Sequence, residues 1–492
     1  MRAETIEQLV CPYTGGSLTV RVVAQSGDGD IEYGLVGSES FDFPIVAGVL
    51  LLGLGKGYGG HEEGLAPYVA LQAAAIDHLR HRDVEGLLWW MSKHCPLVHR
   101  LAIGTFADYR AFATELHART VRLEAAVLAV DADSGVLGDL GVRRRLTRGL
   151  PAAIAGGVHR RLSAVRASLA ARRARREPET VLAQNFYAQR FYSPRAAATT
   201  LQLAHLPVGQ RVLSLCGGHG MFENILALSG RMPQRLVCVD GQLVNLLAVR
   251  RFVTPAADPV CLDVQFDLPF ADGAFDAVFS STCLPEIPAQ AHVVREAVRV
   301  TAATGWTLFD SLWALDSGVL RCDPYRPYRY LQNFLPRAAD YRTVIDRWTG
   351  DRSAGYAFSR DPGAQLSGPI WAFDEAEIEA ELSAATDTEL NALVIDRDRF
   401  AGFVPADHDW MPGALSVSPA YRSAPGAATL LRRRAEFAEM NAVFASLDFP
   451  GLPERVELDT PPAPGSWAGL FAAGVLAALP PDYDVARGPL PH

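Results

Sequence analysis

Apolar and polar positions follow two different periods through the middle of the chain. Short, mostly apolar runs such as Arg211–Leu215 and LVCVD, which ends on Asp240, are typical of strands buried on both faces. Longer segments with helical spacing lie between them, the first beginning near Met221. This alternation predicts an α/β fold, with a doubly wound sheet covered by helices.

The turn after the first strand-like run is rich in glycine. Residues 212–220 read VLSLCGGHG, and Gly217, Gly218 and Gly220 allow the backbone to approach a ligand closely. The next helix directs its free N–H groups at the same place. Asp240 ends the second run, where a carboxylate can accept both hydroxyls of a ribose. These positions predict a nucleoside site.

Four ordered blocks between residues 181 and 310 resemble the class I S-adenosylmethionine-dependent methyltransferases. The blocks are VLSLCGGHG, the acid Asp240, VCLDVQFDLPFADGAFDAVFSS and VVREAVRVTAATGWTLFD. The resemblance implies a Rossmann-like sheet of seven strands, the last antiparallel, and S-adenosyl-L-methionine as the cofactor. It assigns residues 216–220 to the methionine part, Asp240 to the ribose, and Asp263 with the Val264 amide to the adenine edge, with Asp267 as the alternative acid. The full expected set is Cys216, Gly217, Gly218, Gly220, Asp240, Gly241, Asp263, Val264 and Ser280.

Three positions depart from the family pattern. Ser214 stands where the family has an acid that often orders the loop, Cys216 replaces the first glycine, and Trp306 replaces the second glycine before strand five. These departures favour one alternative function, a non-catalytic scaffold built on a methyltransferase fold.

Base candidates lie in loops at the same edge of the sheet. A methyl transfer from a sulfonium needs a general base only if the nucleophile carries a proton. His219 lies in the glycine-rich loop, Glu286 follows strand four, and Asp310 closes strand five. Each also has a structural interpretation: a hydrogen bond to the cofactor carboxylate, a helix cap and a backbone turn, respectively.

Residues 1–57 predict a small β-rich domain. LVCPYTGGSLTVRVV and FDFPIVAGVLLL resemble the two ends of the zinc-ribbon activator domain that partners or fuses with RNA and protein methyltransferases. A tetrahedral zinc site needs four ligands, and here Cys11 stands alone, with Thr14 at the position of the second thiol. We therefore expect a docking domain with no metal.

Residues 58–180 have helical spacing and end in an arginine-rich segment. Eleven arginines and no acid lie between residues 142 and 176, in a chain with a net charge of −9. The segment could bind RNA or an acidic carrier protein, or it could pack on the acidic body of the chain itself.

The methyltransferase-like domain is expected over residues 181–410. Tyr187 and Tyr192 precede its first strand and could face the substrate. Residues 311–371, rich in Tyr, Arg and Pro, are expected as a lid insertion above the ligand crevice, with Arg326 and Tyr328 as substrate contacts. We expect Leu390–Ile395 to lie in the sixth strand. Residues 411–492 are expected as an irregular extension with a final helix over Trp467–Leu479.

Composition limits the cellular setting. Of 492 residues, 49% are hydrophobic, and no apolar stretch reaches the ~20 residues that a membrane span needs. No secretion signal is visible after Met1, and seven scattered cysteines favour reduced thiols, so we expect a cytoplasmic protein.

The leading functional hypothesis is methylation of a small-molecule acceptor of the specialised-metabolite type, in a biosynthesis role. The lid insertion and the two helical regions favour it. An RNA or protein methyltransferase is the alternative, favoured by the ribbon and the arginine-rich segment. The asparagine-proline-proline-tyrosine type of motif is absent, since strand four ends SSTCLPE, which argues against base-amino or glutamine methylation.

Overall fold

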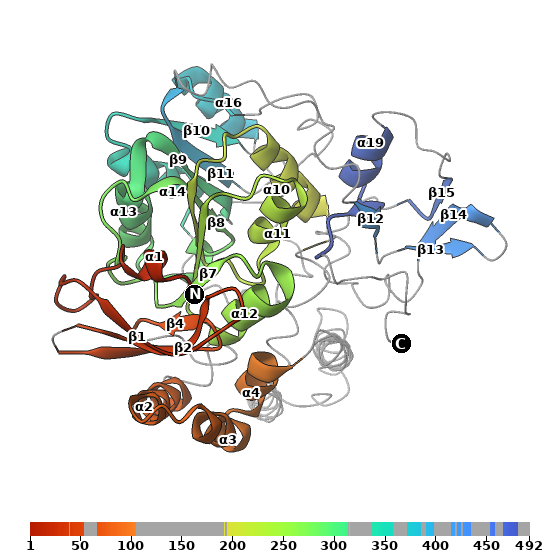
Figure 1. Cartoon of the computed structure of the whole chain (residues 1–492). Helices are drawn as coiled ribbons and strands as arrows, with labels where there is room; N and C mark the ends of the chain where they lie inside the picture. The colour runs from red at the N-terminus through yellow and green to blue at the C-terminus, as the bar shows by residue number, and fades with distance from the viewer. Residues whose placement is uncertain are drawn as a thin grey trace, which may run out of the picture.

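The computed structural model describes 291 of the 492 residues, most of them around one large central sheet. The described residues are 1–38, 40–53, 66–104, 191, 194–312, 314, 336–357, 371–384, 390–397, 415–418, 421–424, 427–433, 453–457 and 466–480. The sheet has eleven strands in the order β1-β2-β3-β4-β7-β6-β5-β8-β9-β11-β10 (Figure 1).

Seven of these strands form the doubly wound unit predicted from the sequence. They are β5 (Arg211–Leu215), β6 (Arg235–Asp240), β7 (Asp258–Cys261), β8 (Phe275–Ser281), β9 (Thr301–Leu312), β10 (Ser353–Ala357) and β11 (Leu390–Ile395). β5 to β9 are parallel, and β11 is antiparallel to both β9 and β10. The predicted α/β fold is confirmed, including the antiparallel last strand.

Two expectations about the end of this unit are corrected. Leu390–Ile395 is the seventh strand in chain order rather than the sixth, because β10 precedes it. β10 and helix α14 (Ala338–Trp348) both lie inside residues 311–371, which were expected as a lid. Since β10 pairs with β11 along its whole length, residues 338–357 belong to the sheet and its covering layer.

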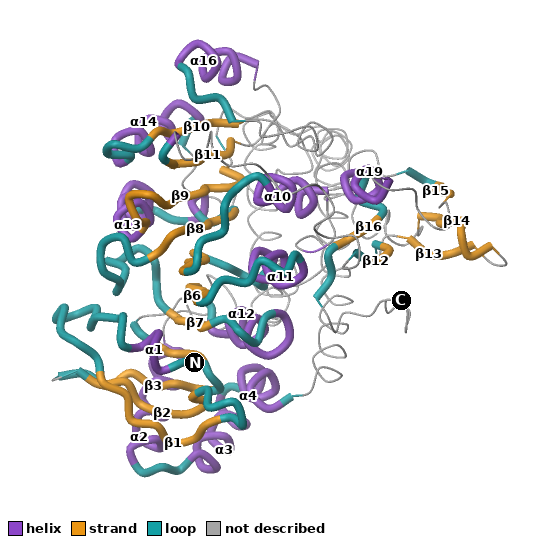
Figure 2. The backbone as a smooth tube through the Cα atoms, turned by 45° about the horizontal axis from the view of Figure 1, so that its top comes forward, coloured by secondary structure: helices purple, strands orange, loops and turns teal. Residues whose placement is uncertain are grey.

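Helices cover both faces of the sheet (Figure 2). One hydrophobic core packs α2, α3, α4, α10, α11 and α12 against one face, and a second core packs α1, α13, α14 and α16 against the other. Their bounds are α1 (Ala3–Ile6), α2 (Ala66–Arg80), α3 (Val84–His94), α4 (Pro96–Ile103), α10 (Pro194–Ala204), α11 (Met221–Leu228), α12 (Leu243–Ala248), α13 (Gln290–Val300) and α16 (Glu375–Ala384). A π-helical turn, Val249–Val253, extends α12, and a 3₁₀ turn, Leu284–Glu286, follows β8.

The N-terminal strands continue the central sheet. They are β1 (Thr19–Gln25), β2 (Ile31–Gly37), β3 (Asp42–Val46) and β4 (Val49–Leu51). Ala47 and Gly48, both with positive φ, form the tight turn that a two-residue hairpin requires. β4 then pairs in parallel with β7, placing Leu50 beside Val260. The β-rich unit is therefore joined to the doubly wound unit by backbone hydrogen bonds.

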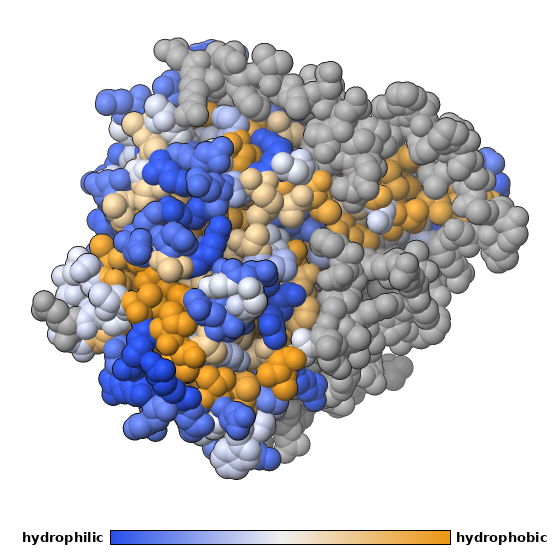
Figure 3. Space-filling view, viewed as in Figure 1, coloured by the Kyte–Doolittle hydropathy of each residue, from blue (hydrophilic) through white to orange (hydrophobic). Residues whose placement is uncertain are grey.

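A buried carboxylate reinforces this junction. Asp258, at the start of β7, is 1% exposed and accepts hydrogen bonds from the Arg2 amide at 2.9 Å and the Thr5 hydroxyl at 2.5 Å. The Val10 amide also donates to the Pro269 carbonyl at 3.1 Å. Figure 3 shows hydrophobic surface gathered over the region of these N-terminal strands. Among the described residues, Tyr13 and Phe41 have exposed side chains.

The C-terminal part adds small sheets. β12 (Ser416–Val417) pairs with β16 (Leu476–Ala477), and β13 (Tyr421–Ala424), β14 (Ala427–Arg433) and β15 (Arg455–Glu457) form a second sheet. Helix α19 (Ser466–Ala472) packs on α10. This helix ends earlier than the helix expected over Trp467–Leu479, because Gly474 adopts φ +71° and turns the chain into β16. No helix in the described part of the chain is long and apolar enough to cross a membrane.

Candidate active site

The expected nucleoside site lies where the strand order reverses. β5 has β6 on one side and β8 on the other, so the connections that follow these strands run in opposite directions from this point of the sheet. The glycine-rich loop, residues 216–220, follows β5 and caps helix α11 at Gly220, whose φ is +82°. This placement brings the loop to the edge at which ligands bind in open α/β sheets.

Asp240 joins the glycine-rich loop to the second strand. The Gly218 amide donates to one carboxylate oxygen at 3.0 Å, and the Gln242 amide donates to the other at 2.7 Å. Asp240 is 7% exposed, and a β-carbon built on Gly218 would meet no atom within 4 Å. An open glycine backbone beside an acid at the strand tip fits the ribose and methionine parts of a nucleoside cofactor.

The other expected cofactor residues lie along the same edge. Asp263 and Val264 follow β7, with Asp263 half-buried and its carboxylate bonded to the Gln265 amide at 3.0 Å. Gly241 follows β6, and Ser280 lies near the end of β8, buried. Asp267, the alternative acid, points elsewhere: it pairs with Arg295 of α13 at 3.3 Å. Asp263 is therefore the better placed of the two acids.

The loop after β8 is linked covalently to the glycine-rich loop. Cys216 and Cys283 form a disulfide, although they are 67 residues apart in the sequence. Cys216 adopts φ +53°, as a glycine would, and Thr282 beside Cys283 adopts φ +54°. The expectation of reduced thiols is thus wrong for this pair, because adjacent parallel strands bring both loops to one edge. Cys11, Cys95, Cys238 and Cys261 are free and buried.

Glu223, which sequence reasoning missed, lies under the same loop. It is in the first turn of α11 and fully buried, and burial raises the pKa of its carboxyl group. Ser214 of β5 and Cys238 of β6 are its polar neighbours. A charged residue on the buried side of an otherwise apolar helix, three positions after Gly220, was the available signal.

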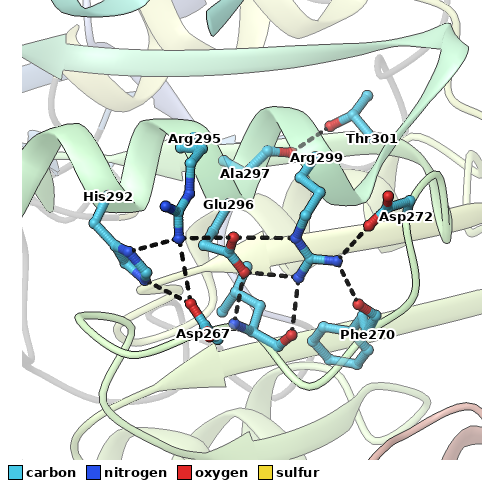
Figure 4. Close-up of polar contacts among 10 residues, drawn as sticks. Asp267, Phe270, Asp272, His292, Arg295, Glu296, Ala297, Arg299 and Thr301 are labelled. Atoms are coloured by element: carbon cyan, nitrogen blue, oxygen red, sulfur yellow. Dashed lines mark hydrogen bonds and ion pairs between the residues drawn. The ribbon is translucent and has the colours of Figure 1, made fainter. Parts of the chain in front are cut away.

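A second buried glutamate lies where two of the sequence blocks meet (Figure 4). Glu296 of α13 accepts from Arg299 at 2.6 and 3.0 Å and from the Leu268 amide at 2.9 Å. Arg299 in turn donates to the carbonyls of Leu268 at 3.0 Å and Phe270 at 2.8 Å. We call Glu296 and Arg299 the α13 clamp. It attaches REAVRV to LPF, so both blocks have a structural role.

The base candidates have different surroundings. His219 is buried in the glycine-rich loop, at 3% exposed. Asp310 is also buried, and one of its oxygens accepts from the hydroxyls of Thr199 at 3.0 Å, Ser281 at 2.6 Å and Ser311 at 2.9 Å. Glu286 ends the 3₁₀ turn after β8, but its side chain lies outside the described part of the structure. Asp310 thus has a clear structural use, as a hub for three hydroxyls.

Several predicted residues lie outside the described residues. These are Tyr187 and Tyr192, Arg326 and Tyr328, and the arginine-rich segment at 142–176. Trp306, one of the three departures, is described: it is 2% exposed and its indole N–H donates to the Pro207 carbonyl at 2.6 Å. It therefore fills the core beside the approach to β5.

The match to a protein family covers the same strands. Residues 213–309 match the family model described as a methyltransferase domain. The chain contains a methyltransferase domain. The matched residues run from β5 to β9, the parallel strands whose ends carry the glycine-rich loop and Asp240. Among curated proteins, none matches the chain.

Solved structures of methyltransferases align with about two fifths of this chain. A methyltransferase from Mesorhizobium loti is 17% identical, with 40% of this chain and 96% of that chain covered, at a TM-score of 0.28. Phosphoethanolamine N-methyltransferase 2 from Haemonchus contortus, in complex with S-adenosyl-L-methionine, is 16% identical over 41% and 52%, at 0.30. A complex of the Haloferax volcanii Trm112 methyltransferase activator with a chain provisionally named a methyltransferase gives 19% over 41% and 89%, at 0.29. At these TM-scores the likeness supports no inference about substrate or partner.

Within the described residues, no group of three or more His, Cys, Asp or Glu side chains could hold a metal ion. Cys11 of the N-terminal unit is buried instead among hydroxyl groups. Burial alone would raise the pKa of its thiol, but hydrogen bonds with Thr14 and Ser38 lower it below the ordinary value. Thr14, at the position expected for a second thiol, is thus an uncharged hydrogen-bond partner of Cys11.

Proposed function

We propose that the methyltransferase domain transfers a methyl group to a small-molecule acceptor of the specialised-metabolite type. The proposal that the domain binds the cofactor rests on one observation: the Gly218 amide donates a hydrogen bond to Asp240 beside an open glycine backbone. The small-molecule part is supported by the Tyr- and Arg-rich sequence expected to cover the crevice and by the SSTCLPE ending of β8.

Bound S-adenosylmethionine would supply a methyl group already activated on a sulfonium. The remaining work for the protein is to hold the acceptor close and in line and to exclude water. In this proposal Asp240 accepts the ribose hydroxyls, residues 216–220 contact the methionine part, and Asp263 with the Val264 amide contacts the adenine edge. Gly241 and Ser280 complete the pocket.

Proton removal is needed only for a protonated acceptor. Of the three candidates we would test His219 first, because it lies in the glycine-rich loop and Asp310 already accepts hydrogen bonds from three hydroxyl groups. Glu286 remains the second candidate. His219→Ala should lower turnover while S-adenosylhomocysteine affinity stays within a few-fold, if the histidine acts as the base.

The test of the cofactor site uses Asp240. Replacing it by Ala removes hydrogen bonds to a charged acceptor, each worth roughly 1.5–3 kcal/mol, so affinity for S-adenosylhomocysteine should fall at least tenfold in calorimetry. Asp267→Ala, the matched control on the neighbouring loop, should bind as wild type. Equal binding by wild type and Asp240→Ala would refute this ribose assignment. No binding by wild type would favour the scaffold alternative.

The choice of acceptor is tested by two further variants. Deleting residues 321–330 should abolish turnover and spare cofactor binding, if Arg326 and Tyr328 contact a small substrate. Neutralising Arg172, Arg173, Arg175 and Arg176 together should leave activity within a few-fold. The reverse pattern would favour the RNA or protein alternative, as would a steep loss of RNA binding with salt, by about 0.7 in log–log slope per contacted phosphate on single strands.

We also propose that the N-terminal unit is a built-in ribbon-like activator domain without zinc. The pairing of β4 with β7 and the buried Asp258 contacts support a role in stabilising the methyltransferase sheet. A metal-free core is supported by the sequence, since Cys11 is the only cysteine in residues 1–57 and a zinc site needs four ligands. Metal analysis of untagged protein should give well under one zinc per chain, and stoichiometric zinc would overturn this assignment.

A further inference from the structure

A carboxyl group is buried directly beneath the glycine-rich loop. Glu223 is 0% exposed, and its two oxygens have no hydrogen bond of good geometry within the described residues. It projects from the first turn of α11 toward β5 and β6. A carboxyl group in this position loses its hydration on folding, which is costly unless hydrogen bonds compensate for it.

Three polar atoms from three elements converge beneath Gly217. A β-carbon built on Gly217 would lie 2.7 Å from Oε1 of Glu223, 2.6 Å from Sγ of Cys238 and 2.9 Å from Oγ of Ser214. Ser214 and Cys238 are direct partners in the β5–β6 pairing. The loop therefore rests on a cluster formed by Ser214, Cys238 and Glu223, and no side chain fits at position 217.

The sequence lacks an acid on β5 at this place. Ser214, with a short neutral side chain, occupies the position where related domains have an acid that often orders the loop. Glu223 carries a carboxyl group to the same spot from the opposite direction, since its Oε1 and the Ser214 Oγ both lie within 3 Å of one point under Gly217. The helix thus supplies what the strand does not.

We propose that Glu223 is a positioning residue for the cofactor: its carboxyl group replaces the acid missing at Ser214 and supports Gly217 from below. The inference rests on the proposed cofactor site. Gly217 donates its amide to the Val239 carbonyl at 3.2 Å, and the next amide, of Gly218, donates to Asp240. Moving Gly217 would therefore move the amide that meets the ribose-binding acid.

The surroundings of this carboxyl group favour its neutral form. Burial raises its pKa, and the nearby charge of Asp240 raises it further, whereas Cys238 and Ser214, which can donate hydrogen bonds to it, oppose the rise. Burial and Glu223 also raise the pKa of the Cys238 thiol well above its ordinary value. A neutral cluster leaves Asp240 as the charged group at the cofactor edge of β6.

The experiment measures S-adenosylhomocysteine affinity and melting temperature for four variants. Glu223→Gln keeps the shape and should bind within threefold of wild type. Glu223→Ala should bind at least tenfold more weakly. Ser214→Asp in the Glu223→Ala background returns an acid to β5 and should recover most of that loss. Asn224→Ala, which removes a buried bond of the same helix to the Ala478 carbonyl, should lower the melting temperature and leave affinity unchanged.

The outcomes separate positioning from mere packing. Wild-type affinity in folded Glu223→Ala, or no recovery in the Ser214→Asp/Glu223→Ala protein, would overturn the proposal. If Glu223→Ala does not fold, Glu223→Gln decides: wild-type affinity should weaken toward alkaline pH as Glu223 ionises, and the glutamine variant should lack that weakening. Identical pH profiles would overturn it. Failure of wild type itself to bind would instead refute the proposed function, and this inference with it.

Discussion

Among the described residues of this domain, two glutamates are buried, and their surroundings differ in charge. Glu223 lies under the glycine-rich loop at 0% exposed, and Glu296 lies in the α13 clamp at 2% exposed. Burial raises the pKa of Glu223, and only neutral groups oppose it. Burial also acts to raise the pKa of Glu296, but hydrogen bonds from Arg299 and the Leu268 amide outweigh it and lower that pKa. Two glutamates with little exposed surface thus have pKa values shifted in opposite directions.

The difference shows how each region is held. Charge fixes the α13 clamp, because Arg299 bridges Glu296, Asp272 and two backbone carbonyls. Packing and a covalent bond fix the loop region, where a neutral cluster supports Gly217 and the Cys216–Cys283 disulfide joins two loops. Ionic conditions should therefore act on one region and reducing conditions on the other.

The largest expected effect is reduction of the disulfide. Closing a segment of 67 residues should contribute about 2–4 kcal/mol to the free energy of unfolding. Urea unfolding with and without a dithiol reductant should show this loss in wild type and none in Cys216→Ser/Cys283→Ser. Alkylation of the unreduced, denatured protein should leave these two cysteines unmodified. Full labelling of both would show that the loops are not linked.

Breaking the α13 clamp comes next. Glu296→Ala leaves the Leu268 amide and part of the Arg299 guanidinium without their acceptor, which should cost about 2–3 kcal/mol of unfolding free energy. Urea unfolding measures it, with Asp267→Ala as a control, since that carboxylate is exposed and pairs only at the surface. A loss below about 0.5 kcal/mol would mean that the clamp contributes no more than a surface ion pair.

Adding one carbon at Gly217 tests the loop region. Gly217→Ala would crowd three atoms within 3 Å, so we expect about 1–3 kcal/mol of destabilisation together with weaker S-adenosylhomocysteine binding. Gly230→Ala is not a suitable control because φ there is +65°, but Gly27→Ala meets no atom within 4 Å. Equal stability of Gly217→Ala and Gly27→Ala would mean that the side chains beneath Gly217 can move aside at little cost.

The smallest expected effects are on how stability changes with pH, where the two glutamates should act in opposite directions. A glutamate with a lowered pKa stabilises the fold above its ordinary value near 4.5, and that contribution is lost as pH falls through the folded pKa. A glutamate with a raised pKa does the reverse, losing its contribution as pH rises from 4.5 through the folded value. Melting temperatures of Glu296→Gln and Glu223→Gln, from pH 3 to 9 in steps of about 0.5, should flatten opposite ends of the wild-type curve. If both variants flattened the same end of the curve, the two glutamates would not have opposite pKa shifts.

The local pattern of apolar residues was sufficient to predict the doubly wound unit. β5, β6 and β8 read as apolar runs because parallel strands buried on both faces need continuous apolar sequence. The glycine-rich loop and Asp240 could be found for the same reason: a ligand site at strand ends requires special residues at fixed places along one chain segment. The strand within the expected lid was less predictable, since β10 is short and three of its five residues are glycine or alanine, which carry little strand signal.

Long-range pairings could not be derived in this way. Nothing local to Val49–Leu51 indicates that it pairs with β7, about two hundred residues later, and nothing local to Cys283 indicates Cys216 as its partner. Such contacts depend on which edges the rest of the chain leaves available.

The sequence by itself determined the α/β class, the order of the methyltransferase blocks and the acid at the end of β6, because each is written in consecutive residues. Only the tertiary structure decided the roles of Glu223 and Glu296. Both are glutamates in helices next to family blocks, and the sequence does not distinguish them. Arg299 and a backbone amide meet one, and a serine and a cysteine from two strands meet the other. The partner brought close by folding, and not the residue type, sets the direction of the pKa shift.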